Sequence, residues 1–282
     1  MFCQRAMAAG TDYDVDLGAA NFGHLNQSNS VPGGVGPDVP NPNPPPSFIN
    51  NYCAPTSTMN SFTFLQKTYP NVYGNNNQLQ GGTGSWTAAA QALAGLAGPP
   101  LYMNTDPNTG TTENNWVDGK VAWLEKYAPG KTIYEGEDTL YTGTQAWVDT
   151  KTKPTANFLY DMLKAGEDVE IGLSPTVGNG IGHVMTLTSI HWNDADNSGT
   201  FNAGDTLQID GIDPGNPGFP FLYTLNPADA SGFMTFKGGD YNTYRLDAAL
   251  AESPVPLPAA VWGGILLLSG LVARRRYASL AS

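Results

Sequence analysis

Cysteine is nearly absent from this chain of 282 residues, which contains only Cys3 and Cys53. Cys3 stands next to the start, so Cys53 has no obvious disulfide partner. Charged residues are also few, at 13%, and the formal net charge is -12. Nucleic-acid binding needs clustered Lys and Arg to meet the phosphates, so this acidic balance argues against a nucleic-acid partner.

Turn-forming residues are what the chain has in abundance. It contains 33 Gly and 22 Pro, together with many Asn and Thr. This polar, turn-rich composition is typical of an extracytoplasmic protein. The length fits one large domain with appendages, since domains usually span ~100–200 residues.

The C-terminal tail, residues 251–282, predicts a membrane address. No charged residue occurs from Val255 to Ala273, and Arg274–Arg276 follow at once. A buried core helix would be amphipathic, whereas this run is apolar all round and about long enough to span a bilayer. The arginines satisfy the positive-inside preference, so we expect the body of the chain outside the cytoplasm.

The order of Pro256-Leu257-Pro258, apolar helix, arginine cluster and chain end resembles the PEP-CTERM sorting signal of Gram-negative bacteria. The resemblance implies export, transient anchoring of the C-terminal helix in the inner membrane, and cleavage by an exosortase near Pro256–Pro258. The product would reside at the cell surface or in the extracellular matrix.

The N-terminus lacks the apolar stretch of a secretory signal peptide. It does carry Ala6-Met7-Ala8 before Ala9, a typical cleavage pattern. We therefore expect a precursor that begins further upstream, with Cys3 in the removed part. Residues 1–46 are interpreted as this remnant plus a Pro/Gly/Asn-rich arm, and residues 47–250 as the folded domain.

Helices are expected first in that domain and strands afterwards. Apolar spacing, Pro at helix starts and Gly at helix ends predict helices at 55–67, 85–98, 114–130 and 154–166. After Gly166, period-two alternation predicts strands at 167–174, 183–192, 205–213, 219–225 and 232–238. This order indicates an α+β fold with antiparallel strands.

Cys53 is a candidate nucleophile because it lies at the mouth of the first expected helix. There the helix dipole and free N–H groups stabilise a thiolate and supply half of an oxyanion hole. The alternative is a buried, inert cysteine. Among the imidazoles, His24 precedes the Pro-rich arm and His191 adjoins Trp192, whereas His183 opens a strand behind a glycine-rich loop. His183 is therefore the expected general base.

A carboxylate at the end of the following strand is expected to orient the imidazole. Asp213 precedes Pro214, which restricts it to extended geometry and ends the strand, so it is preferred over Asp210.

The order of "NYCAPTSTMNSFTFL", "EDVEIGL", "GHVMTLTSI" and Asp213-Pro214 resembles the papain-like cysteine peptidases, nearest to the double-glycine, bacteriocin-processing branch. The resemblance covers about Ser47 to Pro220. It implies N-terminal helices packed on a C-terminal antiparallel β-sheet, a peptide or protein substrate, and a triad of Cys53, His183 and Asp213.

One position departs from that family. A glutamine that completes the oxyanion hole stands about six residues before the cysteine, and Ser47 occupies this place here. Asn50 and Asn51 are the candidate replacements. The alternative function is therefore a catalytically inactive surface or matrix protein that binds peptide or polysaccharide.

The segment "DADNSGTFNAGD" between two expected strands predicts a structural calcium site. Gly199 stands where a twelve-residue calcium loop makes its sharp turn. A plain Asx-rich hairpin loop is the alternative. The expected ligands are Asp194, Asp196, Ser198, Thr200 through its carbonyl, Asn202 and Asp205.

Overall fold

The computed structural model describes residues 10–29, 51–75, 77–95, 98–177, 182–218 and 221–256. Short 3-10 turns lie at Ala19–Asn21, Gln27–Asn29 and Gln78–Gln80. The other elements are, in chain order, β1 (Thr11–Asp16), α1 (Cys53–Thr68), α2 (Pro70–Tyr73), α3 (Trp86–Leu93), α4 (Glu113–Tyr127), β2 (Thr132–Asp138), β3 (Val148–Asp149), α5 (Ala156–Ala165), β4 (Asp168–Pro175), β5 (His183–Asp194), β6 (Thr206–Ile212), β7 (Phe221–Asn226), β8 (Thr235–Lys237) and β9 (Tyr244–Pro254).

Side-chain caps explain where three of the helices begin. The hydroxyls of Ser85, Thr112 and Thr155 accept hydrogen bonds from backbone amides in the first turns of α3, α4 and α5. Gly166 ends α5 in the left-handed conformation, at φ 82°. Helix α1 differs, because Tyr52 precedes it without a side-chain cap and leaves its first N–H groups open.

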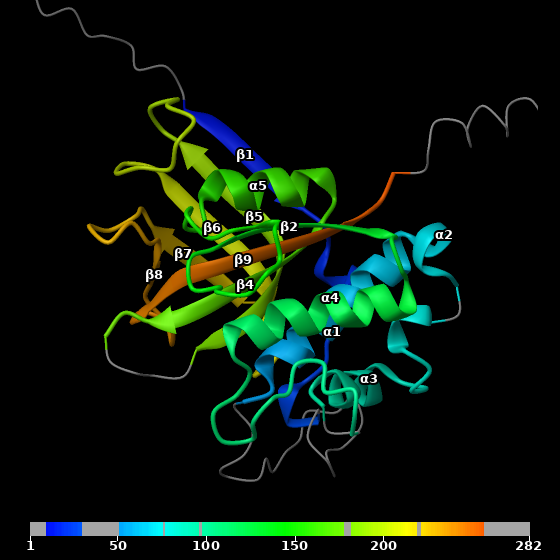
Figure 1. The fold of residues 1–282 in the computed structure, drawn as a ribbon. Coiled ribbons are helices and arrows are strands. Elements are labelled where there is room, and N and C mark those ends of the chain that lie inside the picture. Colours follow the sequence, from blue (N-terminus) through cyan, green and yellow to red (C-terminus); the bar gives the residue numbers. More distant parts are fainter. Residues whose placement is uncertain are drawn as a thin grey trace, which may run out of the picture.

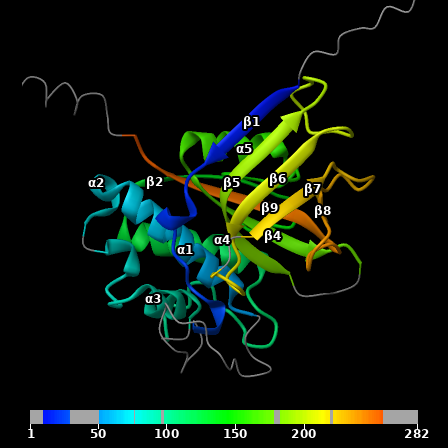
Figure 2. The ribbon, with the colours of Figure 1, turned by 180° about the vertical axis from the view of Figure 1, so that it is seen from behind.

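Six antiparallel strands close into a barrel (Figures 1 and 2). The ring runs β4, β5, β6, β7, β8 and β9, and β9 returns to β4. Strand β1 extends one edge by pairing with the second half of β5, and β2, which carries the short parallel β3, pairs with β9. Long strands thus allow three further strands to attach outside the ring.

Alternating side chains divide the interior into two cores. Val169 and Ile171 of β4 point into the barrel, where they join a cluster that includes Leu159 and Leu163 of α5. The outward positions of the same wall, such as Leu250 of β9, join a second cluster with α1, α3 and α4. Helices α1 to α4 therefore gather on one side of the barrel, while α5 lies apart from them (Figure 1).

The barrel overturns the fold expected from the sequence. A papain-like arrangement of helices on a C-terminal antiparallel sheet is wrong for this chain, because β9 closes the strands into a ring. Strand β9 was missed since its Ala-rich sequence has low β-propensity. Two boundaries also differ: β1 lies within the segment interpreted as an arm, and β9 extends to Pro254 in the segment interpreted as the tail.

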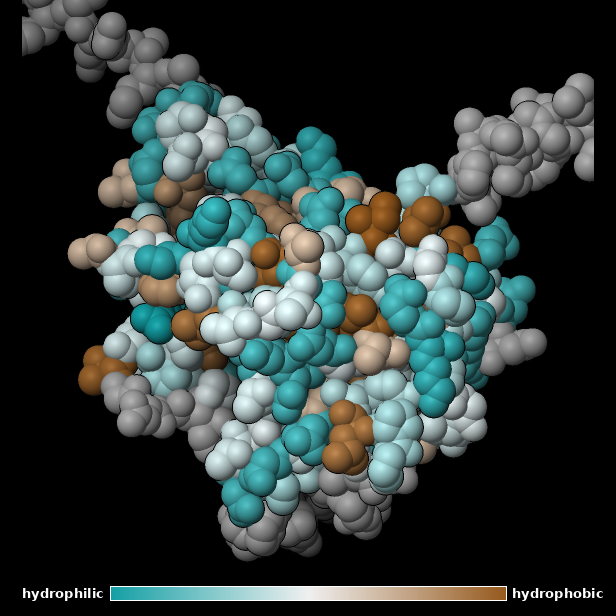
Figure 3. Space-filling view, in the orientation of Figure 1, coloured by the Kyte–Doolittle hydropathy of each residue, from teal (hydrophilic) through white to brown (hydrophobic). Residues whose placement is uncertain are grey.

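Within the described ranges, every helix is too short or too polar to cross a membrane. The expected transmembrane helix falls in residues 257–282, outside those ranges. On the face in Figure 3, apolar residues are scattered among polar ones.

Candidate active site

Cys53 is the first residue of α1 and exposes 7% of its surface. Two hydrogen bonds fix the start of this helix against β5: the Ser57 hydroxyl donates to the carbonyl of Val184 (2.8 Å), and the Thr186 hydroxyl donates to the carbonyl of Ser57 (3.0 Å). Because His183 is the first residue of β5, this contact brings Cys53 and His183 together.

The Cys53 thiol lies beside His183 and near the backbone amides of Ala54 and Val184, which act on its pKa as donors. Burial acts to raise the pKa of the thiol, but these donors outweigh it and lower the pKa below its ordinary value. The thiolate is therefore favoured, as nucleophilic catalysis requires.

His183 contacts Asp213 through its other ring nitrogen. The distance from Nε2 to Oδ1 of Asp213 is 2.8 Å, and the two side chains are only 11% and 14% exposed. Burial acts to lower the pKa of His183, but Asp213 and Cys53 together raise it to about 10. The pKa shifts of Cys53 and His183 are thus both in the direction that favours a thiolate and imidazolium pair.

Asp213 lies just after β6 and accepts two further hydrogen bonds. The amide of Gly215 donates to Oδ1 (2.7 Å), and the hydroxyl of Tyr241 donates to Oδ2 (2.9 Å). Burial acts to raise the pKa of Asp213, but His183 and these donors lower it, so the carboxylate stays charged. The ring of Tyr241 also stacks on His183 at 5.5 Å. Tyr241 was missed from the sequence, because nothing in its local pattern marks it.

The other titratable candidates lie elsewhere. His24 is exposed and contacts the carbonyls of Pro217 and Ala19. His191 is 47% exposed, with Asp14 3.9 Å away. Asp210 accepts a hydrogen bond from Ser189 on the neighbouring strand. The structure therefore brings Cys53, His183 and Asp213 together. His24, His191 and Asp210 lie apart from them.

Of the two oxyanion candidates, only Asn51 is within the described residues, and Asn50 is outside them. Asn51 lines the cavity beside Cys53. Its Nδ2 donates to the carbonyl of Pro107 (2.7 Å), which uses one of the two N–H groups. The amide of Cys53 also lies in the uncapped first turn of α1. The second N–H of Asn51 and the amide of Cys53 are therefore the candidate donors to a developing oxyanion.

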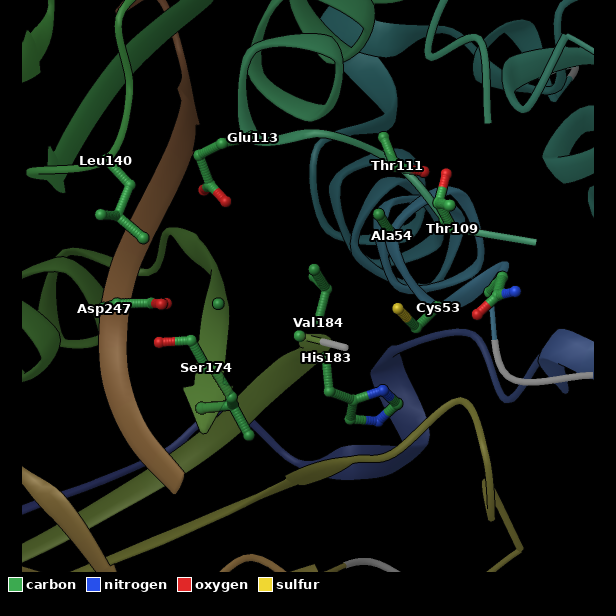
Figure 4. Close-up of a pocket in the computed structure, with 15 residues that line it drawn as sticks. Cys53, Ala54, Thr109, Thr111, Glu113, Leu140, Ser174, His183, Val184 and Asp247 are labelled. Carbon is green, nitrogen blue, oxygen red and sulfur yellow. The ribbon is translucent and has the colours of Figure 1, made fainter. Parts of the chain in front are cut away.

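A cavity of about 180 Å³ opens beside Cys53 and His183 (Figure 4). Cys53 and His183 lie at one end in the view, and Glu113, Ser174 and Asp247 lie at the other. The carboxyl groups of Glu113 and Asp247 are directed inward, and the Ser174 hydroxyl is directed toward Asp247. The cavity is large compared with the ~30 Å³ occupied by a water molecule. No pattern in the sequence marks the three residues at the far end.

The expected calcium loop joins β5 to β6. Carboxylate oxygens of Asp194, Asp196 and Asp205 lie within 4.8 Å of one another. The side-chain nitrogen of Asn202 is 2.9–3.3 Å from both oxygens of Asp196, from the Ser198 hydroxyl and from the carbonyl of Thr200. One amide nitrogen therefore sits among four oxygens, an environment that also suits a hard cation.

Comparison of the sequence with protein-family models and with curated proteins gave no match.

Proposed function

We propose that this chain is a thiol peptidase that acts on peptides through Cys53, His183 and Asp213. The observation that carries the proposal is that Cys53 and His183 line one cavity while His183 is hydrogen-bonded to Asp213. The proposal rests on this geometry and not on the fold, since one chemistry recurs on unrelated folds.

Each residue of the triad has a separate role in peptide cleavage. The Cys53 thiolate attacks the peptide carbonyl carbon, and the amides near the start of α1 meet the oxygen as it gains charge. The His183 imidazolium gives its proton to the departing amine, which leaves a thioester on Cys53. A water molecule then gives a proton to His183 and attacks the thioester, which releases the acid and restores the thiol pair. Asp213 holds the imidazole in the required tautomer and orientation.

The test is cleavage of a broad peptide library by the wild type and by Cys53→Ala, His183→Ala and His191→Ala. We expect Cys53→Ala and His183→Ala each to lose ~10³-fold or more of the turnover, since nucleophile and base act as a unit. His191→Ala is the matched control and should keep full activity. Equal activity of the wild type and Cys53→Ala would contradict the proposal.

If the wild type cleaves no peptide of the library, an active-site acyl probe shows whether Cys53 is reactive. If the library is not cleaved and the probe fails to label Cys53, the chain is the non-catalytic surface or matrix protein that the missing glutamine at Ser47 favours. Labelling of Cys53 without cleavage would instead mean that the library lacks the substrate.

We also propose that a structural calcium ion binds Asp194, Asp196, Ser198, Thr200, Asn202 and Asp205. Support comes from the oxygen atoms gathered around Asn202 and from the left-handed conformation of Gly199, at φ 69°, where a calcium loop turns sharply. In such a site Asn202 would present its side-chain oxygen instead of its nitrogen.

The cellular address remains a proposal from the tail sequence. We propose that the chain is exported, anchored in the inner membrane and processed by an exosortase near Pro256–Pro258. Replacing Arg274–Arg276 by Gln should reduce surface display, which fractionation of cells carrying each form would measure. If the wild-type and Gln-substituted forms are displayed equally, both in cells with an exosortase and in cells without one, this address is contradicted.

A further inference from the structure

The far end of the cavity beside Cys53 is acidic and contains no cation of its own. Among the fifteen residues that line it are Glu113 and Asp247, and none is Lys or Arg. In Figure 4 both carboxyl groups point into the space opposite Cys53 and His183, and the Ser174 hydroxyl points toward Asp247. Any peptide held for attack by Cys53 therefore has this acidic wall within the same cavity.

A β-bulge turns Asp247 toward the cavity. Gly172 of β4 pairs with Ala248, but the next residue, Leu173, pairs with Leu246, so Asp247 is left over. Ala249 and Ala251 point into the barrel, and regular alternation would put Asp247 there too. Because of the bulge, Leu246 takes the inward position and Asp247 faces the helices. Bulges beside active sites commonly redirect a side chain in this way.

Asp247 is only 3% exposed, although burial of a carboxylate is unfavourable. Burial raises its pKa to about 6, and the Ser174 hydrogen bond and the charge of Arg245 only partly oppose this rise. Arg245 lies over the ring of Phe233, at 4.2 Å, and donates to the Ser174 hydroxyl. At neutral pH Asp247 is thus a buried carboxylate whose negative charge is stabilised only in part by Ser174 and Arg245.

Glu113, the other carboxyl of the wall, is paired with Asp138. No other donor in the described part of the chain reaches the buried Oε1 of Glu113 or the buried Oδ2 of Asp138. Burial and the neighbouring Asp138 raise the pKa of Glu113 well above its ordinary value, and a side-chain hydrogen bond joins the two carboxyls. Glu113 therefore adds a polar carboxyl, paired with Asp138, to the wall in which Asp247 is buried.

From these observations we infer that the wall of Asp247, Glu113 and Ser174 is the subsite for a cationic group of the substrate peptide. The group is an ammonium or guanidinium, carried by a Lys or Arg side chain near the scissile bond or by a free peptide N-terminus. A metal ion fits less well, since the carboxylates close enough to share one are found elsewhere in the described residues. This inference rests on the proposed thiol peptidase.

The experiment uses peptidyl vinyl sulfones, which alkylate a nucleophilic thiol. The two residues nearest the reactive group are varied in turn among Lys, Arg, norleucine, Gln and Glu, each with a free or an acetylated N-terminus. The rate of Cys53 labelling is followed by intact mass. Lys and Arg should label about 30-fold faster than norleucine at one position, because a buried charge partner is worth that much or more. If the cation is the N-terminus, the acetylated probes lose the advantage instead.

Variants assign the preference to the wall. In Asp247→Asn the cationic advantage should fall below about threefold. Asp161→Asn, an exposed carboxylate on α5, is the control and should keep the wild-type preference. Melting temperatures of both variants show whether each is folded, and the comparison among probes on the wild type needs no variant.

Two failures are distinguishable. If norleucine or Glu probes label Cys53 as fast as every cationic probe, the inference is overturned while the thiol peptidase stands. If no probe labels Cys53 and the library is not cleaved, the proposed function falls and takes the subsite with it.

Discussion

Tyr241 is a single residue that contacts two members of the candidate triad. Its hydroxyl donates to Asp213 Oδ2 and its ring stacks on His183, so it restrains both the carboxylate and the imidazole. Tyr223 packs edge-on against the same ring at 5.5 Å and holds it in place. Tyr241 is therefore a positioning residue that acts through Asp213 and His183.

Tyr241→Phe should keep the stacking and lose the hydrogen bond. A hydrogen bond to a charged group contributes ~1.5–3 kcal/mol, so we expect kcat to fall about tenfold or more while KM changes little. Tyr160→Phe, whose ring packs on Tyr13 beside β1, is the matched control. Steady-state kinetics on a cleaved library peptide measures both constants. An unchanged kcat in Tyr241→Phe would mean that Asp213 is held well enough without it.

The loop between β5 and β6 is the element in which metal binding would affect stability. It is tied to β1 through the Thr11 hydroxyl, which donates to Asn197, and to α5 through Asn157, which donates to the carbonyl of Gly199. Ordering this loop therefore also fixes the edge formed by β1.

Calcium should raise the melting temperature through this loop. A ligand that binds only the folded state stabilises by ~2.7 kcal/mol at a hundredfold excess over its dissociation constant. We expect the increase in millimolar calcium relative to excess chelator, and we expect Asp196→Asn to abolish it. Asp161→Asn should respond like the wild type. A melting temperature that ignores calcium in the wild type would show that the segment is an Asx-rich hairpin loop.

Helix α4 is joined to the barrel wall by a buried ionic cluster. The Nζ of Lys120 is 2.8 Å from Glu252 on β9 and 3.2 Å from Glu170 on β4, and all three side chains are fully buried. Thr58 and the indole of Trp116 also donate to Glu170. Both carboxylates gain partners from the helices that cover β4 and β9.

Lys120→Met should destabilise the fold by ~3–5 kcal/mol, because it leaves buried carboxylates without their cation. Lys126→Met, an exposed lysine on the same helix, should cost less than about 1 kcal/mol. Adding Glu252→Gln to Lys120→Met should recover part of the loss, since it removes one uncompensated charge. Chemical denaturation of the four proteins measures this, and equal effects of the two lysine variants would contradict it.

Elements with strong local patterns were predictable from the sequence, and those defined by pairing were not. The helices near 55–67 and 114–130 correspond to α1 and α4. Strand β9 was missed because Ala and Leu favour a helix in isolation. The grouping of Cys53, His183 and Asp213 followed from their order along the elements. Asp247 was not foreseeable, since its direction depends on a bulge that exists only once β4 and β9 pair.

At the scale of the whole molecule, buried carboxyls bind protons more tightly in the folded state than in the unfolded chain. Burial and Glu170 raise the pKa of Glu252 from 4.5 to about 7, against the opposing effect of Lys120. Burial raises that of Asp247 from 3.8 to about 6. Asp168, whose two oxygens have no donor among the described residues, is raised as well. These groups stabilise the fold fully below their unfolded pKa values, and the contribution is lost as the pH rises through the folded values.

The free energy of unfolding should therefore be higher at pH 5 than at pH 8. The shift of Glu252 alone corresponds to an effect on the order of 3 kcal/mol. The raised pKa of His183 acts in the same direction above pH 6.5, but the lowered pKa of its partner Cys53 opposes it, and the lowered pKa of Asp213 matters only in stronger acid. Denaturant unfolding at both pH values, with chelator present to exclude calcium, measures the difference.

High salt separates this effect from the repulsion of an acidic chain with a net charge of -12. Repulsion between exposed charges also weakens as the pH falls, but 0.5 M salt screens it, and salt screens the buried groups much less. Most of the difference should thus survive in high salt, and Glu252→Gln should reduce it. A stability that is equal at both pH values in high salt, or greater at pH 8, would show that the buried carboxyls are ionised at little cost because the fold supplies them with partners.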